Sequence, residues 1–301
     1  MNLYLYCNQA NFTDKQIEEL KNNYAVFFVA DNNLSPLFED KQDKVIALDP
    51  DIVGWTFSND TIDKIANLKA ICLQTTGYEW IDYKYCVSKG IVVTNVPKYS
   101  SNAVAEQCIF MAFALTRKYP LFAKEGKMNW APEFVAGDMT NKKAGIIGLG
   151  SIGTRVAALC KGLGMDVCYY SNEKDNKDFT YVEFSELIST CDYVFITVSK
   201  NEASVDLLSE KNLENLAPSA NVISVVNALN IKDKLTSLVA EGKINGAAFE
   251  DESPDLTKRQ GNIFVTPYNA YYTKEALVNM FNIWVDTIIA AASNAPINTI
   301  K

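Results

Sequence analysis

Short apolar runs alternate with polar stretches along the chain, and their spacing predicts its secondary structure. Between residues 2 and 96, strand-like runs rich in β-branched and aromatic residues are separated by polar, helix-like stretches. These runs are NLYLYC, AVFFVA, KVIALD, KAICLQT and IVVTNV. Strands separated by helices pack most simply as a parallel sheet, so this part of the chain is expected to form an α/β domain.

A second alternating series follows between residues 144 and 266. Its strand-like runs are AGIIGLG, DVCYYS, DYVFITV, NVISVV, GAAFE and IFVT, and helical segments such as IGTRVAALCKGLG lie between most of them. Strands that are apolar almost throughout are typical of a parallel sheet covered on both faces. Six such strands match a doubly wound dinucleotide-binding fold.

Two long helices are expected beside these series. The segment SSNAVAEQCIFMAFALTRKYP is apolar nearly all round and ends at Pro120, which predicts a helix buried between two domains. The segment TKEALVNMFNIWVDTIIAAASN has one apolar face and is expected to return to the first domain. We therefore expect an α/β protein of two domains, each a mainly parallel sheet flanked by helices. The expected boundaries are 1–97 plus 273–301 for one domain and 98–272 for the other.

Composition and charge narrow the class of function. The chain has 301 residues and a net charge of −8, with no basic run, which argues against nucleic acid and anionic membranes as partners. The start lacks the features of a signal peptide, and no apolar run is expected to be long enough to cross a bilayer. Seven scattered cysteines predict buried free thiols and a cytoplasmic location. With no histidine and no paired cysteines, no metal site is expected.

A glycine-rich loop leaves the first strand of the second series. Gly148, Gly150 and Gly153 form the pattern G-x-G-x-x-G between an apolar strand and a helix. In this context the glycines allow a tight turn, close approach of a pyrophosphate, and close packing of the helix on the strand. The amides of Ser151 and Ile152 would then point at the phosphates from the helix N-terminus. The loop predicts binding of a dinucleotide, NAD(P).

The end of the next strand bears on the choice between NAD and NADP. An NAD site usually has an acidic residue here that binds the ribose 2′-hydroxyl, but this chain has Ser171 and Asn172, with Lys174 close by. Loss of the acid removes repulsion against a 2′-phosphate, although Glu173 and Asp175 return negative charge. We expect NADP rather than NAD.

Several motifs in order resemble the D-2-hydroxyacid dehydrogenase family over nearly the whole chain. They include LKAICLQTTGYEWID, GIVVTNVPKYSSNAVAEQ, GIIGLGSIG, GKINGAAFEDESPD and NIFVTPYNAYYT, the last closest to the D-lactate and 2-hydroxyisocaproate branch. The resemblance implies a Rossmann dinucleotide domain inserted into a flavodoxin-like substrate domain. It also implies a homodimer, with the active site in the cleft between the domains.

The resemblance assigns binding roles to further residues. The substrate carboxylate would meet backbone amides around Thr76 and Gly77. On the cofactor side, Val198 and Ser199 would pass under the adenosine, and Glu250 matches the acid that binds the nicotinamide amide. The residues expected near the cleft are Tyr78, Lys98, Tyr99 and Ser100.

The catalytic residues of the family are changed in this chain. The family uses an arginine, a histidine and a glutamate. The arginine position is occupied by Asn227, or by Val226 if the loop is one residue shorter, and the histidine position by Tyr268. The glutamate matches Glu252 or Asp255, depending on where a gap is placed.

Three interpretations of these changes remain open. Tyr268 could donate the proton in a slow reduction of a 2-oxo acid or of an uncharged carbonyl compound, with Lys98 or Lys274 as the neighbouring cation. The chain could instead bind NAD(P) without turnover and report redox state to a partner. Alternatively, the active site has moved and carries out different chemistry. Taken by itself, Tyr268 could also be only an aromatic lid over an empty pocket.

Substitute carboxylate clamps are also conceivable at three arginines. Arg155 lies in the cofactor helix and Arg117 at the end of the long helix, so structural or solvated roles are expected for both. Arg259 lies in a loop that could reach the rim of the cleft.

Overall fold

The computed structural model describes residues 1–226 and 231–300, and the chain divides into two compact units. The first unit comprises Met1–Ser100 and Lys274–Lys301, and the second comprises Ser101–Thr273. Each unit has its own sheet and its own hydrophobic core.

The first unit is built on a five-stranded parallel sheet with the order β2-β1-β3-β4-β5. All five strands coincide with the apolar runs expected from the sequence. This order is that of a flavodoxin-like fold. The strands are β1 (Asn2–Tyr6), β2 (Ala25–Val29), β3 (Lys44–Leu48), β4 (Leu68–Leu73) and β5 (Val92–Thr94).

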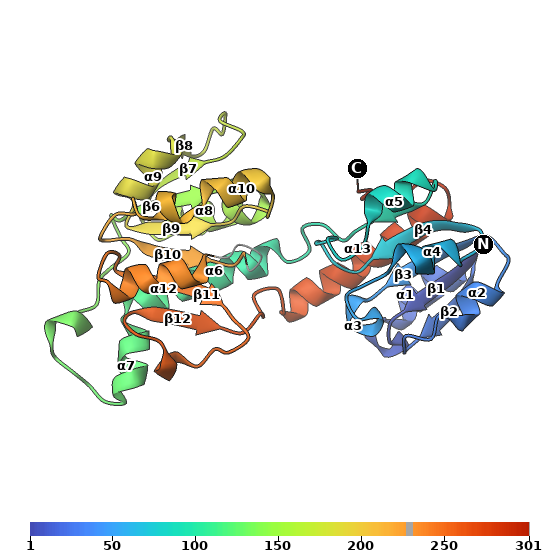
Figure 1. Ribbon diagram of the computed structural model, residues 1–301, viewed down its shortest axis with the longest axis horizontal. Coiled ribbons are helices and arrows are strands. Elements are labelled where there is room, and N and C mark those ends of the chain that lie inside the picture. The colour runs from blue at the N-terminus through green and yellow to red at the C-terminus, as the bar shows by residue number, and fades with distance from the viewer. Residues whose placement is uncertain (227–230, 301) are drawn as a thin grey trace. The chain divides into compact units, whose positions relative to one another are not determined.

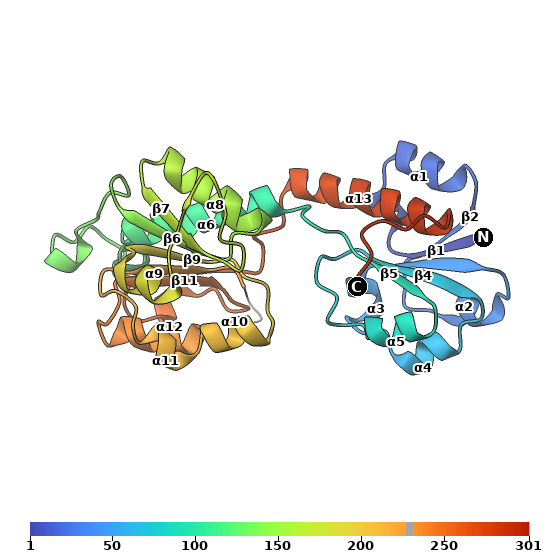
Figure 2. The same cartoon turned by 90° about the horizontal axis from the view of Figure 1, so that it is seen from above.

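Helices cover both faces of this sheet. Figure 2 shows α1 and α13 on one face and α2 to α5 on the other. The fully buried Trp284 of α13 donates a hydrogen bond from Nε1 to the carbonyl of Cys72 in β4, at 3.1 Å. The helices are α1 (Asp14–Lys21), α2 (Ser35–Glu39), α3 (Pro50–Val53), α4 (Asn59–Asp63), α5 (Tyr83–Ser88) and α13 (Lys274–Ala292), with a short 3-10 helix at Gln9–Asn11.

The expectation that no apolar run is long enough to cross a bilayer is wrong for α13. By length and composition alone, this helix is long and apolar enough to span a membrane. In the first unit, however, its apolar face packs on β3, β4 and α1, with Met280, Trp284 and Ile288 in the core. The apolar character of α13 is thus explained by core packing.

The second unit contains a seven-stranded parallel sheet within the described residues, in the order β12-β11-β10-β9-β6-β7-β8. The strand order reverses between β6 and β9, as in a Rossmann fold. Six strands match the predicted runs, and the two-residue edge strand β8 was not expected. The strands are β6 (Lys143–Ile147), β7 (Asp166–Tyr170), β8 (Thr180–Tyr181), β9 (Tyr193–Ile196), β10 (Asn221–Ser224), β11 (Gly246–Glu250) and β12 (Ile263–Thr266).

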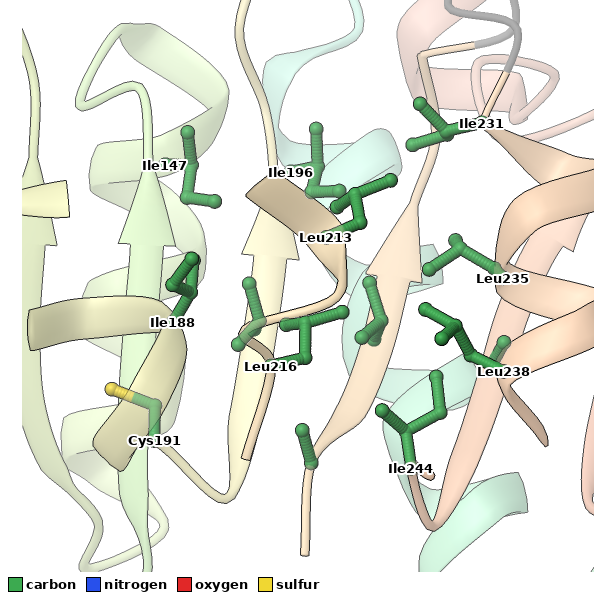
Figure 3. Close-up of a cluster of buried hydrophobic side chains, with 14 of the residues drawn as sticks. Ile147, Ile188, Cys191, Ile196, Leu213, Leu216, Ile231, Leu235, Leu238 and Ile244 are labelled. Atoms are coloured by element: carbon green, nitrogen blue, oxygen red, sulfur yellow. The ribbon is translucent and has the colours of Figure 1, made fainter. Parts of the chain in front are cut away.

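Helices again lie on both faces of the sheet, with α6 and α8 on one side and α9 to α12 on the other (Figures 1 and 2). Figure 3 shows the core under α9 to α12, where Leu213, Leu216 and Leu235 pack against strand residues such as Ile147 and Ile196. The helices are α6 (Ser101–Thr116), α7 (Tyr119–Glu125), α8 (Ser151–Gly162), α9 (Phe184–Thr190), α10 (Glu202–Leu207), α11 (Glu210–Leu213) and α12 (Lys232–Ala240), with 3-10 helices at Pro132–Phe134 and Leu256–Lys258.

The long helix α6 ends earlier than its sequence predicts. It stops at Thr116, and Lys118 then adopts a left-handed conformation with φ of 55°. Pro120 therefore lies in the first turn of the next helix, α7, where its missing N–H has no cost. The helix is also not buried all round, because Phe110 and Phe113 are 53% and 37% exposed.

All seven cysteines are buried free thiols, as expected. Cys168 and Cys191 lie closest to each other, with 3.5 Å between their sulfur atoms. This distance is far longer than a disulfide bond.

Candidate functional site

The glycine loop forms the tight link between β6 and α8 that its sequence predicts. Gly148 has φ of +94°, and a Cβ there would lie 2.7 Å from Cγ1 of Val198. A Cβ on Gly153 would lie 2.0 Å from the carbonyl oxygen of Gly148, so no side chain fits. A Cβ on Gly150, by contrast, would meet no atom within 4 Å. The surface at Gly150 is therefore open for the close approach of a ligand.

The start of α8 lies directly at this open surface. Gly150 is the N-cap residue, and Ser151 and Ile152 are the first two helical residues. Backbone amides in the first turn of a helix lack partners within the helix and favour anions. The loop thus fits a pyrophosphate, and this fit does not depend on any charged side chain.

The second cofactor-side segment follows β9. Thr197 donates a hydrogen bond from Oγ1 to the carbonyl of Gly148 at 2.7 Å, and from its amide to Ile147 at 2.9 Å. Val198 consequently packs beside the glycine loop, and Ser199 follows it on the exposed surface. This is the point at which the strand order reverses, where ligands bind in doubly wound sheets.

A cavity of about 510 Å³ lies between the glycine loop and the segment after β7. It is lined by Leu149 and residues 172–176, next to Ser171 at the end of the strand. Lys174 lies in its wall, with Nζ 3.3 Å from the Glu183 carboxylate and 4.6 Å from the centre of the Tyr181 ring. The cavity thus brings together Asn172 and Lys174, which the sequence analysis assigned to the cofactor ribose.

Glu250 ends β11 and is almost completely buried. Its Oε1 accepts hydrogen bonds from the backbone amides of Asn269 and Ala270, both at 2.8 Å. These amides belong to the turn that directly follows Tyr268. Glu250 therefore fixes this turn, a role that the sequence motif did not indicate.

Tyr268 follows β12 and is 41% exposed. Its hydroxyl accepts a hydrogen bond from Nζ of Lys232 at 3.2 Å, and the same ammonium lies 5.0 Å from the centre of the Tyr268 ring. Lys232 is the first residue of α12 and was not predicted as a site residue. Its position in the chain could have indicated a role, because Lys232 comes shortly after the loop in which the family carries its arginine. Asn227, the predicted replacement, lies outside the described residues, whereas Val226 packs partly buried against the core.

The acids near β11 have other partners. Asp251 binds Arg259, with 2.9 Å between Oδ2 and Nη2, and both side chains are about one quarter exposed. Burial opposes ionisation of Asp251, but the Ser253 amide and the charges of Lys232 and Arg259 outweigh it. The pKa of Asp251 is therefore held below its ordinary value.

The two candidates for the family glutamate differ in their surroundings. Asp255 caps the 3-10 helix Leu256–Lys258 by accepting bonds from the amide and hydroxyl of Thr257. Bonds from Thr257 and Lys258 lower the pKa of Asp255. A carboxylate held in this way serves as a cap. Glu252 is exposed on the same loop.

The remaining candidate arginines also have partners within the second unit. Arg155 donates from Nε to Oδ1 of Asn102 at 2.7 Å, and Arg117 lies 3.5 Å from the Asp138 carboxylate. These contacts agree with the structural roles expected for both residues.

In the first unit, the predicted substrate residues follow β4 and β5. Thr76 donates from Oγ1 to the carbonyl of Val96 at 2.7 Å and accepts at its own carbonyl from Asn95, which ties the two loops together. A Cβ on Gly77 would lie 2.9 Å from Oε2 of Glu79, the end of an exposed and flexible side chain that can move aside.

The other predicted substrate residues border the same two loops. Tyr78 packs edge-on against Tyr83, at 5.3 Å between ring centres. Lys98 has a left-handed conformation with φ of 61°, and Tyr99 packs against the core under α13. The structure thus groups these residues at the carboxyl edge of the sheet of the first unit.

The parallel sheet of the second unit explains how distant segments meet. All its strands point the same way, so every loop that follows a strand emerges at the same edge of the sheet. That edge carries the glycine loop after β6, Val198 after β9, Glu250 at the end of β11 and Tyr268 after β12. The glycine loop lies in the interior of this strand order, whereas the phenol–ammonium pair of Tyr268 and Lys232 lies beside the edge strand β12.

The sequence is similar to those of known dehydrogenases. The family model described as D-isomer specific 2-hydroxyacid dehydrogenase, NAD binding domain, matches residues 109–270. A candidate 2-hydroxyacid dehydrogenase of Staphylococcus aureus (strain bovine RF122 / ET3-1) is 31% identical over 256 residues, which is 80% of this chain and 81% of the relative. D-lactate dehydrogenase of Treponema pallidum (strain Nichols) is 29% identical over 71% of this chain and 72% of its own.

Solved structures share the fold. D-lactate dehydrogenase from Aquifex aeolicus, complexed with NAD and lactic acid, superposes with a TM-score of 0.78 at 21% identity, over 98% of this chain and 96% of that one. An acyclic imino acid reductase in complex with NADPH and D-Arg gives a TM-score of 0.82 at 23% identity, over the whole of both chains.

Proposed function

Because this chain belongs to the D-isomer specific 2-hydroxyacid dehydrogenase family, we propose that it is an NAD(P)-dependent oxidoreductase with a changed catalytic set. Its substrate is a 2-oxo acid or another small carbonyl compound, which it reduces. The observation that carries this proposal is the hydrogen bond between Lys232 and Tyr268 at the carboxyl edge of the second sheet.

Tyr268 is the proposed proton donor. The Lys232 ammonium can only donate, so the Tyr268 oxygen accepts and its own proton stays available for a substrate. A reduced nicotinamide held at the glycine loop would supply the hydride for the carbonyl carbon. As the substrate oxygen becomes negative, the O–H bond of Tyr268 breaks and its proton moves to that oxygen. The phenolate left behind is stabilised by the ammonium and regains a proton from water.

The cofactor is proposed to be NADP in preference to NAD. The end of β7 presents Ser171 and Asn172, neither of which repels a 2′-phosphate, and Lys174 lines the neighbouring cavity. The ion pair of Lys174 with Glu183 weakens this preference, because it offsets the lysine charge. Isothermal titration with NADPH and NADH tests it. NADH binding more than about tenfold tighter than NADPH would reverse the assignment.

The two units have different proposed roles. The second unit, with boundaries expected near 98–272, binds the cofactor through Gly148, Gly150 and Gly153. The first unit, expected near 1–97 plus 273–301, binds the substrate through the loops that contain Thr76 and Lys98. The other proposed substrate residues are Gly77, Tyr78 and Tyr99. Glu252 or Asp255 remains the candidate for the family glutamate.

A homodimer is the proposed assembly, in the cytoplasm. The second unit exposes large apolar side chains on α6, α7 and the following loop, which extends away from the sheet of this unit in Figure 1. Phe110 and Tyr119 both pack edge-on against Phe264, at 5.4 and 6.0 Å between ring centres, so they form one aromatic surface. Such exposed apolar surface is typical of protein interfaces.

Turnover measurements test the function. Loss of NADPH and NADH absorbance is followed with a panel of 2-oxo acids, neutral ketones and aldehydes, for the wild type and Tyr268→Phe. Tyr272→Phe, which removes an exposed hydroxyl from the same segment, is the matched control. Wild-type turnover that Tyr268→Phe loses and Tyr272→Phe keeps supports Tyr268 as the donor. Turnover that Tyr268→Phe keeps would place the proton donor elsewhere.

The alternative function is an NAD(P)-binding protein without turnover. It is favoured by the loss of the family histidine and arginine alongside an intact glycine loop. Tight binding of NADPH or NADH with no turnover across the panel would select this alternative.

A further inference from the structure

The ammonium of Lys232 lies among one hydroxyl and two aromatic rings of the second unit. Besides the Tyr268 hydroxyl, it faces two aromatic rings, with Nζ 5.0 Å from the Tyr268 ring centre and 6.0 Å from that of Phe249. Two further charged residues belong to this part of the second unit: Asp251, whose carboxylate interacts with the Lys232 charge, and Arg259. These two form their own ion pair at 2.9 Å, and the Arg259 guanidinium lies 5.8 Å from the Phe249 ring centre. Asp251, whose carboxylate interacts with the charge of Lys232, is thus already paired with Arg259.

The donor capacity of Lys232 is therefore only partly used. An ammonium has three N–H donors. One is directed at the Tyr268 oxygen, and across residues 1–226 and 231–300 no carboxylate forms an ion pair with Lys232. The remaining donors can bind an anion placed beside the phenol.

We propose that Lys232 takes over the charge of the missing family arginine: it orients the Tyr268 phenol and binds the carboxylate of a 2-oxo acid substrate. In such a substrate the carbonyl oxygen and a carboxylate oxygen are neighbours. The Tyr268 hydroxyl is a proton donor and the Lys232 ammonium is a cation, and their oxygen and nitrogen atoms are 3.2 Å apart. The two groups can therefore meet the carbonyl oxygen and the carboxylate oxygen of one substrate. This inference rests on the proposed function and narrows its substrate to a carbonyl compound that carries a carboxylate.

The chain position of Lys232 supports this role. The family arginine follows the strand that corresponds to β10, in the loop that leads to α12, and Lys232 is the first residue of that helix. A lysine side chain is long enough to bring charge back from the helix start to Tyr268, as the 3.2 Å contact shows. Unlike arginine, it binds a carboxylate as a point charge and not through a planar fork.

The test compares wild type, Lys232→Met, Lys232→Arg and Lys211→Met. Met keeps the length of the side chain and removes its charge, Arg keeps the charge, and Lys211 is an exposed lysine on α11 that serves as control. Two readouts are taken: kcat and KM for a 2-oxo acid and for a neutral ketone of similar size, and calorimetric binding of oxamate, an unreactive 2-oxo acid analogue, to protein saturated with NADPH. NADPH affinity is measured separately for each variant.

Lys232→Met is expected to weaken oxamate binding and raise KM for the 2-oxo acid by roughly 10- to 100-fold, as for loss of a charged hydrogen bond. It should also lower kcat, with NADPH affinity unchanged. Lys232→Arg should recover most of the binding, and Lys211→Met should behave like wild type. The neutral ketone should show no comparable change in KM.

Failures of the inference and of the proposed function can be told apart. If the wild type turns over 2-oxo acids and Lys232→Met keeps the same KM and oxamate affinity, the inference is wrong while the function stands. If the wild type reduces only neutral carbonyl compounds, the carboxylate-binding role is wrong. If the wild type turns over no substrate, the proposed function is wrong. The oxamate titration then still tests the inference, which is also wrong if Lys232→Met binds oxamate as tightly as the wild type.

Discussion

The carboxylate of Glu250 accepts a hydrogen bond from the backbone amide of Ala270 at 2.8 Å. The amide of Asn269 donates to the same oxygen at the same distance. A buried side chain at the end of β11 thereby fixes the turn after Tyr268. The position of the proposed proton donor thus depends on an acid 18 residues earlier in the chain.

Glu250→Ala is predicted to destabilise the protein and reduce turnover. The substitution leaves the buried amide of Ala270 and the part-buried amide of Asn269 without their acceptor. An unsatisfied buried group costs about 1–3 kcal/mol, and the more accessible Asn269 amide should cost less. Glu250→Gln retains one acceptor oxygen and should lose less than half as much. Urea unfolding of the three proteins measures the free energies. Equal losses for the two variants would show that the Glu250 oxygen does not hold the turn.

Alanine substitutions in the glycine loop should separate folding from cofactor binding. At Gly150 a Cβ meets no atom of the protein within 4 Å, so Gly150→Ala should fold normally but lower NADPH affinity by about tenfold or more, because the methyl group blocks the pyrophosphate. At Gly153 a Cβ would lie 2.0 Å from the Gly148 carbonyl oxygen. Gly153→Ala should therefore also lose about 1–3 kcal/mol of stability.

Gly162→Ala, at the last residue of α8, is the matched control, since a Cβ there also meets no atom within 4 Å. Thermal melting and NADPH titration measure the two effects. If Gly150→Ala binds NADPH like the wild type, the loop does not carry the pyrophosphate.

The fold could be predicted largely because its signals are local. Buried parallel strands require apolar runs, and each predicted run became a strand. Two features could not be predicted from the sequence, for physical reasons. The edge strand β8 has only two residues, too few for a periodic pattern, and the break between α6 and α7 occurs at Lys118, which adopts a left-handed conformation without a glycine to signal it.

The candidate site could be predicted only where its residues are close together in the sequence. The glycine loop has its strand, turn and helix in sequence, so Gly148, Gly150 and Gly153 were found. Lys232 and Tyr268 are 36 residues apart and belong to different elements, and only the packing of α12 on the sheet brings them together. No local pattern records such a contact.

Asp251 gives the stability a predictable pH dependence. Its pKa is lowered in the folded protein from an ordinary value near 3.8, so the ionised form stabilises the native state above that value. This contribution is lost as the pH falls through the lower, folded pKa. Asp251→Asn should therefore be less stable than the wild type by about 1 kcal/mol at neutral pH, as expected for a partly exposed ion pair with Arg259.

Urea unfolding between pH 7 and pH 3 tests this dependence. The difference between wild type and Asp251→Asn should shrink below about pH 4, where the unfolded chain takes up the proton. Asp233→Asn, on exposed α12 surface, controls for loss of a surface charge. A difference that is absent at neutral pH, or grows on acidification, would contradict a stabilising role of the ion pair.

The aromatic surface around Phe264 predicts where two copies of the chain meet. Phe110 is 53% exposed and Tyr119 54% exposed, and burying such side chains between two chains gains roughly 25 cal/mol for each Å² removed from water. Phe110→Glu places a charge in that contact and should convert a dimer to a monomer, as measured by light scattering after size exclusion. Val87→Glu, at an exposed position of the first unit, is the control and should stay dimeric. A wild-type monomer, or a Phe110→Glu variant that remains dimeric, would exclude this surface as the interface.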